Sequence, residues 1–338
     1  MNFTLCLPEK IIFGSGSISQ LASEVIRLGG NKALIVTSPG MAQRAAFLRI
    51  KDNLHSRGLD SAVFTGVDPE PPMENALGCA KLAGDTGCNV VLGLGGGSVM
   101  DVAKKAAADR GLPRILIPAT AGSGSEVTHE AVLKKSGRKQ AIVDTGLLPD
   151  VAIVDPDISS TMPPQLTAFS GIDALAHAIE CYESRKSNPV VKALALRAYE
   201  LLRDNLKAAI ENLPEARVNM ALGSLMAGMA FGNSGTALGH AVSYALSNRG
   251  VPHGQAVAMA LPGVLEFNRT DAVLVQTLKG IVSLAGSRWD SGWDISEMTN
   301  EVTADRRHLT NNPRDVTATD VQRIFEQIAT DSSAGAQQ

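Results

Sequence analysis

The stretch that decides the fold reads VVLGLGGGSVMDVAKKAA and spans residues 90–107. A short apolar run is followed by three consecutive glycines and then by a helical pattern. Glycines let the backbone approach a ligand closely, and the first N–H groups of a helix favour an anion. The spacing is not the GxGxxG dinucleotide fingerprint, so the residues alone predict an anion site at a strand–helix turn or a tight turn without ligand.

The same alternation of short apolar runs and helical patterns extends through the first 155 residues. The predicted strands are Ala33–Thr37, Ala62–Thr65, Val90–Leu94, Ile115–Pro118 and Val151–Val154, and the predicted helices are Ile18–Leu28, Pro39–Arg57, Met73–Gly84 and Val99–Asp109. Strands separated by segments of helical length indicate βαβ crossovers and a mostly parallel sheet. We therefore expect a doubly wound α/β architecture.

The β-like runs cease after Pro156. The segments that follow are rich in Ala, Leu and Met and are predicted as helices at Pro164–Ser184, Pro189–Asn212, Glu215–Phe231, Leu238–Asn248 and Gln255–Phe267. Because 338 residues suit two cores better than one, we expect a dinucleotide-binding α/β domain at 1–157 and an all-α metal and substrate domain at 158–330. The polar residues 331–338 are predicted to form a flexible tail.

Composition excludes several classes of protein. The net charge of −3 and the absence of a basic cluster argue against nucleic acid as a partner. No basic region precedes an apolar run at the N-terminus, and the longest weakly polar run, 220–232, is too short to span a bilayer. The four cysteines form no CxxC pair. These features predict a cytoplasmic protein with reduced thiols and no membrane partner.

A second loop of glycines and hydroxyl residues, Thr120–Thr128, follows the next predicted strand and precedes a possible helix. Two such loops at the carboxyl ends of neighbouring strands would line one crevice, where open α/β sheets bind ligands. Together they indicate a dinucleotide.

The helical half contains a set of metal-ligand residue types. Asp173 and His177 are four residues apart and would project from one helix face, and His240 and His253 follow. Each histidine alone is more often structural, but one oxygen and three nitrogens suit Fe²⁺ or Zn²⁺. Glu180, on the same helix, either supports a metal ligand or is solvated or structural, and we favour the second interpretation.

At these residues the chain resembles the iron-containing, or group III, alcohol dehydrogenases, which share their fold with glycerol dehydrogenase and dehydroquinate synthase. The matching segments, between about residues 8 and 330, are IIFGSGSISQL, GLGGGSVMDVAKKAA, IPATAGSGSEVT, LLPDVAIVDP, SGIDALAHAIECY, GTALGHAVSYAL and GVPHGQAVAMALP. The resemblance implies a metal-dependent, NAD(P)H-linked alcohol dehydrogenase or aldehyde reductase that forms a homo-oligomer.

The resemblance also implies roles for individual residues. Cofactor binding is expected from Ser38, Gly95, Gly96, Gly97, Ser98, Thr120, Ser123, Thr128 and Lys139, metal binding from Asp173, His177, His240 and His253, and catalytic roles from Asp101 and Tyr244. The metal would polarise the substrate oxygen while hydride moves between the substrate carbon and nicotinamide C4.

Three departures from the family pattern affect these expectations. Ser38 stands where many members carry an aspartate for the ribose hydroxyls, which makes NADP(H) admissible or even preferred. Tyr244 replaces a histidine four residues after the third ligand, and it either relays a proton or only packs. The spacing from His240 to His253 is one residue shorter than expected, and the C-terminal region is abbreviated.

The shortened C-terminal half is similar to phosphonoacetaldehyde reductases within the family. An anionic aldehyde needs cations near the metal, and the candidates are Arg185, Lys186, Arg249 and Arg314. The alternatives are another small-aldehyde reductase, a maleylacetate reductase, a dehydroquinate-synthase-like lyase and a non-catalytic relative.

Overall fold

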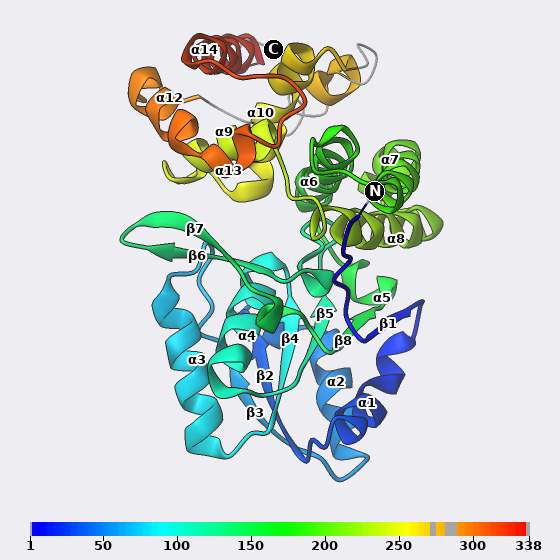
Figure 1. Cartoon of the computed structure of the whole chain (residues 1–338). Helices are drawn as coiled ribbons and strands as arrows, with labels where there is room; N and C mark the ends of the chain where they lie inside the picture. The colour runs from blue at the N-terminus through cyan, green and yellow to red at the C-terminus, as the bar shows by residue number, and fades with distance from the viewer. Residues whose placement is uncertain (1, 271–274, 281–288, 336–338) are drawn as a thin grey trace.

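The computed structural model describes residues 2–270, 275–280 and 289–335. Figure 1 shows a sheet flanked by helices in the lower part of the view and a group of helices above it. The sheet has six parallel strands in the order β1-β8-β5-β4-β2-β3. Their bounds are β1 Lys10–Phe13, β2 Lys32–Thr37, β3 Asp60–Phe64, β4 Val90–Gly95, β5 Arg114–Pro118 and β8 Val151–Val154.

Both faces of this sheet are buried, which explains its continuous apolar runs. In β2, Ile35 packs into the core on one side and Leu34 into the core on the other. Helices α1 (Leu21–Arg27) and α2 (Ala45–His55) supply side chains to the first core, and α3 (Met73–Thr86) and α4 (Gly97–Arg110) supply the second. The predicted doubly wound sheet is confirmed.

Several local predictions were wrong. The edge strand β1 was not predicted, and it forms because residues 10–13 pair in parallel with β8. The possible helix after the loop 120–128 is absent: a 3₁₀ turn at Ser125–Val127 leads into an antiparallel hairpin of β6 (Glu130–Lys135) and β7 (Arg138–Val143). Its strands are charged and half-buried, so they lack the apolar pattern that marks the sheet strands.

Two predicted helices begin later than expected. The segments predicted as Ile18–Leu28 and Pro39–Arg57 each open with a 3₁₀ turn, Ser17–Gln20 and Met41–Gln43, ahead of the α-helix. The helix α14 continues to Gly335, and residues 336–338 lie outside the described residues; the flexible tail at 331–338 stays a prediction.

The second half is helical, as predicted. The chain enters it through α5 (Pro156–Ser159), and the further helices are α6 Pro164–Glu183, α7 Pro189–Ile210, α8 Pro214–Phe231, α9 Leu238–Ser247, α10 His253–Asn268, α12 Ile295–Ala304, α13 Arg306–Leu309 and α14 Ala318–Gly335. One core joins α6, α7, α8 and α10, and another joins α9, α10, α12 and α14. Helix α10 therefore belongs to both groups.

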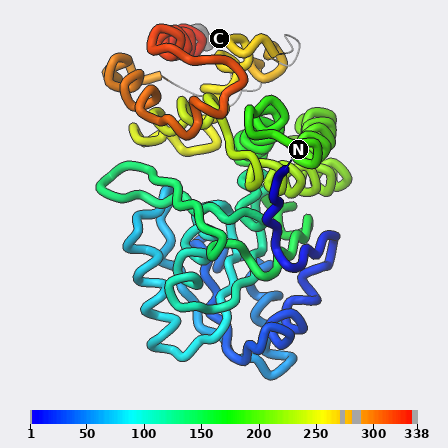
Figure 2. The backbone as a smooth tube through the Cα atoms, viewed as in Figure 1, coloured from blue at the N-terminus to red at the C-terminus, as the bar shows by residue number. Residues whose placement is uncertain are grey.

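The hairpin β6–β7 lies between the two halves, below α9 and α13, as the chain trace in Figure 2 also shows. Arg307 of α13 forms an ion pair with Glu130 of β6, and Asn248 accepts a hydrogen bond from the Lys139 backbone N–H over 3.5 Å. The hairpin thus connects the sheet to the helical half. Among the described residues no helix is both long and apolar enough to cross a membrane, and the four cysteines are free thiols.

Candidate metal and nucleotide site

Helix α6 carries three acidic or imidazole side chains on one buried face. Asp173, His177 and Glu180 are spaced four and three residues apart, so successive turns bring them to the same side of the helix. All three residues are at most 5% exposed. Such groups are rarely buried without partners, so this face of α6 is a candidate ligand site.

Two further histidines converge on Asp173. His240 lies in the first turn of α9, and His253 is the first residue of α10. Their Nε2 atoms lie 3.6 and 3.7 Å from Asp173 Oδ1. One donor atom from each of the three residues lies within 4.8 Å of the other two, which is the arrangement that a single ion can bridge.

Two of these donor atoms have no hydrogen-bond partner within the described part of the chain. Asp173 Oδ1 and His240 Nε2 are both buried and make no hydrogen bond. A carboxylate and an imidazole nitrogen left without partners in a buried site are costly, and a divalent cation satisfies both at once. The residues present therefore fit Fe²⁺ or Zn²⁺.

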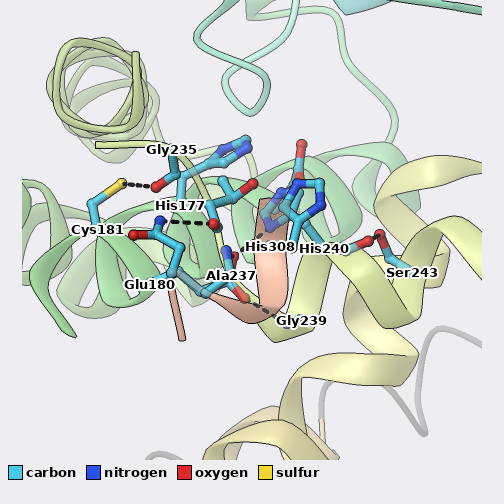
Figure 3. A network of polar contacts seen from close by, with 12 residues as sticks. His177, Glu180, Cys181, Gly235, Ala237, Gly239, His240, Ser243 and His308 are labelled. Carbon is cyan, nitrogen blue, oxygen red and sulfur yellow. Dashed lines mark hydrogen bonds and ion pairs between the residues drawn. The ribbon is translucent and has the colours of Figure 1, made fainter. Parts of the chain in front are cut away.

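Glu180 fixes the orientation of His240 (Figure 3). Its Oε2 accepts hydrogen bonds from His240 Nδ1 over 2.6 Å and from the Ala237 N–H over 3.0 Å, and its Oε1 accepts from the Gly239 N–H over 2.6 Å. Because Nδ1 donates to Glu180, Nε2 is the nitrogen that faces Asp173, and it would bind a metal ion once the ion displaces its proton. Only 3% of Glu180 is exposed, so it is not solvated, and its hydrogen bond to His240 agrees with the alternative that it supports a ligand residue.

Buried charges shift the pKa values of these groups. Burial alone would lower the pKa of His240, but the carboxylates of Glu180 and Asp173 raise it to about 10. Burial would raise the pKa of Asp173, yet the three neighbouring histidines hold it well below its usual range. Asp173 is therefore a carboxylate at neutral pH, the form that binds metal.

His177 lies beside this group without joining it. Its ring stacks on His240 with centroids 4.6 Å apart and on Phe231 with centroids 4.2 Å apart. The group of donor atoms that lie within 4.8 Å of one another does not contain His177. Burial lowers the pKa of His177 to about 4, so its imidazole is neutral. Its role as a fourth ligand stays a prediction.

The glycine loop occupies the carboxyl end of β4, as expected. Gly96 is the N-cap of α4 and no side chain caps the helix, so its first N–H groups are available to an anion. A Cβ on Gly97 would lie 3.1 Å from the Ser123 side chain, and one on Gly95 would lie 2.6 Å from Val99. The turn into α4 leaves no room for a side chain at Gly95, and the approach of the Ser123 loop leaves little room for one at Gly97.

Asp101 and Lys104 join this loop to its neighbours. Asp101 accepts hydrogen bonds from Ser125 Oγ over 2.6 Å and from the Val132 N–H over 2.9 Å. Lys104 is fully buried; its Nζ lies 3.4 Å from Asp101 and donates to carbonyl groups of the segment that leads into β6, including those of Ser125 and Glu130. Both Asp101 oxygens are occupied, which fits a residue that positions the loops.

One cavity unites these elements and encloses about 700 Å³ of space, open solvent at its mouth included. Its described lining residues are Glu70, Pro71, Gly97, Ser98, Asp101, Ser123, Ser125, Thr128, Glu130, Val132, Lys139, Asp173, His177, Phe231, Thr236, His240, Tyr244 and His253. It therefore runs from the start of α4 to the candidate metal ligands, a distribution suited to a cofactor and a small substrate side by side.

Four predicted cofactor residues are not part of this lining. Gly95 and Gly96 form the turn behind it, and Ser38 follows β2 at the same edge of the sheet, where its Oγ accepts from the Met41 N–H. Thr120 lines a smaller cavity beside Glu126. These positions suit the outer part of a dinucleotide better than its reactive end.

Two predicted residues lie near the metal ligands. Tyr244, one turn after His240 in α9, has its ring centroid 6.0 Å from that of His253. Lys139 Nζ lies 5.5 Å from the Tyr244 ring centroid and forms an ion pair with Glu70, a lining residue that sequence reasoning missed. Glu70 gave no signal because it lies in a proline-rich loop far from the recognised motifs.

The four cations proposed for an anionic substrate do not line this cavity. Arg185 pairs with Asp315, and Arg249 pairs with Glu297 and Glu301. Arg314 donates to the Phe267 carbonyl oxygen, and the Lys186 N–H bonds to Ser184. The prediction failed because these residues make their contacts within the helical half, away from the cavity. The placement of all four near the metal was wrong.

Comparison with known proteins agrees with this geometry. Residues 8–156 match the family model of the iron-containing alcohol dehydrogenases, and residues 167–291 match the model of that family's C-terminal domain. The chain is 39% identical over 289 residues to long-chain-alcohol dehydrogenase 1 of Geobacillus thermodenitrificans (strain NG80-2), covering 78% of this chain and 73% of that protein.

Two solved structures have the same fold. An alcohol dehydrogenase from Oenococcus oeni superimposes with a TM-score of 0.90 at 25% identity, over 97% of this chain and all of that chain. A sulfoacetaldehyde reductase from Bifidobacterium kashiwanohense in complex with NAD⁺ superimposes with a TM-score of 0.89 at 28% identity, over 98% of this chain and 99% of the other.

Proposed function

This chain belongs to the iron-containing alcohol dehydrogenase family and is an oxidoreductase, and we propose that it interconverts a small aldehyde and its primary alcohol with a nicotinamide cofactor and one divalent metal ion. The observation that carries this proposal is the pair of buried, unpartnered atoms, Asp173 Oδ1 and His240 Nε2, in a cavity that also reaches the start of α4. A lyase or a non-catalytic relative does not fit this family.

When bound, the metal ion supplies a Lewis acid for the carbonyl oxygen and the reduced nicotinamide supplies the hydride. Asp173, His240 and His253 would hold the ion, with His177 as the predicted fourth ligand. Glu180 holds His240 through Nδ1, which would leave Nε2 as the nitrogen that binds the ion. The α4 N–H groups and Ser98 would hold the pyrophosphate, which sets the distance between cofactor and substrate.

Tyr244 is the proposed source of the proton that the product oxygen needs. It lines the cavity beside His253, and burial raises the pKa of its phenol well above the usual value. A phenol with a high pKa keeps its proton at neutral pH and gives it up only to a stronger base, such as a developing alkoxide. Tyr244→Phe is expected to lower kcat with bound metal unchanged.

The cofactor is proposed to be NADP(H) or NAD(H), with Ser38 as the deciding residue. Ser38 places no carboxylate at the end of β2, so a 2′-phosphate meets no repulsion there. Ser38→Asp is expected to shift kcat/KM toward NADH. If the variant keeps the wild-type preference between NADPH and NADH, another part of the protein recognises the ribose.

A second candidate is an anionic aldehyde such as phosphonoacetaldehyde. The resemblance of the C-terminal half to phosphonoacetaldehyde reductases favours it, as does the structural likeness to a sulfoacetaldehyde reductase. The experiment that tests both candidates follows nicotinamide oxidation by protein loaded with Fe²⁺ or Zn²⁺, with NADPH and with NADH.

The aldehyde panel contains propanal, lactaldehyde, phosphonoacetaldehyde, sulfoacetaldehyde and succinic semialdehyde. Maleylacetate tests the remaining oxidoreductase alternative. Turnover that depends on added metal, and that His240→Ala abolishes, supports the proposal. No turnover of any aldehyde by protein with one bound metal ion per chain would refute it.

A further inference from the structure

The charges that line the cavity are unequal. Among the described lining residues, Lys139 carries the one lysine or arginine side chain, whereas Glu70, Asp101, Glu130 and Asp173 carry carboxylates. An anionic substrate would need a cation that is free to meet it. The state of Lys139 therefore decides whether this cavity accepts a negative charge.

Three of the four carboxylates have partners other than Lys139. Asp101 lies 3.4 Å from the buried Lys104 ammonium, and Glu130 is bound by Arg307 of α13. Asp173 belongs to the metal site described above. Glu70 is left as the acid that forms an ion pair with Lys139.

The backbone holds Glu70 in this position. Its φ is 54°, in the left-handed region that non-glycine residues seldom adopt. The next residues are tied to the hairpin: the Lys134 N–H donates to the Pro71 carbonyl oxygen over 2.8 Å, and Pro72 bridges to Lys134. The hairpin thus fixes both members of the pair, since Lys139 lies on β7.

The ion pair is well shielded from solvent and lies toward the reacting end of the cavity. The Lys139 side chain is 5% exposed and that of Glu70 is 19% exposed. Lys139 Nζ lies over the Tyr244 ring, which in turn lies beside His253. The pair therefore lines the same cavity as the candidate metal ligands and lies beside one of them, His253.

We propose that Glu70 is a specificity-determining residue that neutralises Lys139 and so selects uncharged aldehydes over anionic ones. The inference rests on the proposed aldehyde reductase activity and names the substrate class for it. A sulfonate or phosphonate entering the cavity would have to displace a carboxylate from Lys139 or lie beside it, and like charges repel strongly where water is excluded. An uncharged aldehyde neither has to displace the Glu70 carboxylate nor is repelled by it.

The test compares Glu70→Gln with the wild-type enzyme on propanal and sulfoacetaldehyde. Glutamine keeps the shape of the side chain and removes its charge, which frees the Lys139 ammonium. The ratio of kcat/KM for sulfoacetaldehyde to that for propanal is expected to rise by about tenfold or more. Glu74→Gln is the matched control, because Glu74 is exposed in the first turn of α3 and outside the cavity.

Two further variants separate charge from backbone. Glu70→Gly removes the charge and suits the positive φ, so it should raise the ratio as Glu70→Gln does. Adding Lys139→Met to Glu70→Gln should abolish the gain, because the freed cation is then missing.

Binding of the product analogue 2-hydroxyethanesulfonate, measured by calorimetry, gives a readout that does not need turnover. Glu70→Gln should bind it about tenfold more tightly than the wild type, with the affinity for 1-propanol unchanged. A wild-type enzyme that prefers sulfoacetaldehyde, or equal ratios and equal sulfonate affinities in both proteins, would overturn the inference. So would an altered KM for the nicotinamide cofactor with all aldehydes affected equally, which would make the pair a cofactor contact.

If the proposed aldehyde reductase activity is itself wrong, the measurements give another result. In that case no aldehyde is turned over by either protein, while the sulfonate affinities still decide whether Glu70 excludes anions.

Discussion

Glu180→Gln tests whether a buried carboxylate outside the metal shell controls metal binding. Both oxygens of Glu180 are used: Oε2 accepts from His240 Nδ1 and the Ala237 N–H, and Oε1 accepts from the Gly239 N–H. An amide has one oxygen and one NH₂ group. Whichever way it is turned, it directs a donor at a donor and leaves at least one buried N–H group without a partner.

The expected cost has two parts. One unsatisfied buried donor lowers the free energy of unfolding by about 1–3 kcal/mol. Loss of the carboxylate behind a metal-binding histidine lowers metal affinity by about 10–100-fold, which corresponds to about 1.4–2.7 kcal/mol. The loss of metal affinity should be larger than a local loosening of α9 alone would cause, because the His240 ring is then no longer held in place by Glu180.

The assay is Zn²⁺ titration against a competing chelator, with urea unfolding of the metal-free protein measured in parallel. Glu183→Gln is the control, since Glu183 lies one turn further along α6 and accepts a hydrogen bond from Thr270. Metal affinity of Glu180→Gln within about twofold of the wild type would refute the reasoning. An equal loss in Glu183→Gln would show that helix stability, not the orientation of His240, sets the affinity.

Three other changes have defined outcomes. Lys104→Met leaves Asp101 buried without its cation and should lower the free energy of unfolding by about 3–5 kcal/mol in urea, whereas Lys105→Met, on the partly exposed side of α4, should have little effect. Burial raises the pKa of Glu126 from 4.5 to about 7. The folded state thus holds this proton more tightly, and stability falls as pH rises from about 4.5 to 7. Glu126→Gln should remove that fall and gain at most about 3 kcal/mol at pH 8, with no gain at pH 4.5; equal gains at both pH values would contradict the assignment. His177→Ala should lower bound metal and turnover together, and unchanged metal content by elemental analysis would exclude it as a ligand.

Local sequence patterns were sufficient for the architecture. Strands buried on both faces must be apolar throughout, so β2, β4 and β5 could be predicted from short apolar runs in the sequence. The helices that cover them must repeat their apolar residues at helical spacing. The spacing of Asp173 and His177 likewise predicted a shared helix face. These features depend on neighbours in the sequence, which is why the sequence reveals them.

Other features depend on partners that are distant in the chain. The strand β1 exists because it pairs with residues 151–154, and the hairpin β6–β7 because Pro72 and α13 hold it from either side. The hairpin does have a local signal, because Ser136 and Gly137 form its two-residue turn at positive φ between two short apolar runs, whereas a helix was the expectation there. The four residues of β1 become a strand only through their hydrogen bonds with β8.

The functional groups divide in the same way. The sequence by itself determined the fold class, the glycine loop and the metal-ligand residue types, because each is a local pattern of residues. Only the tertiary structure decided that Glu180 orients His240, that Arg249 and Arg314 lie away from the cavity, and that Glu70 neutralises Lys139. Charges interact through space and burial strengthens their interaction, so their effect follows from the folded arrangement and not from their order in the chain.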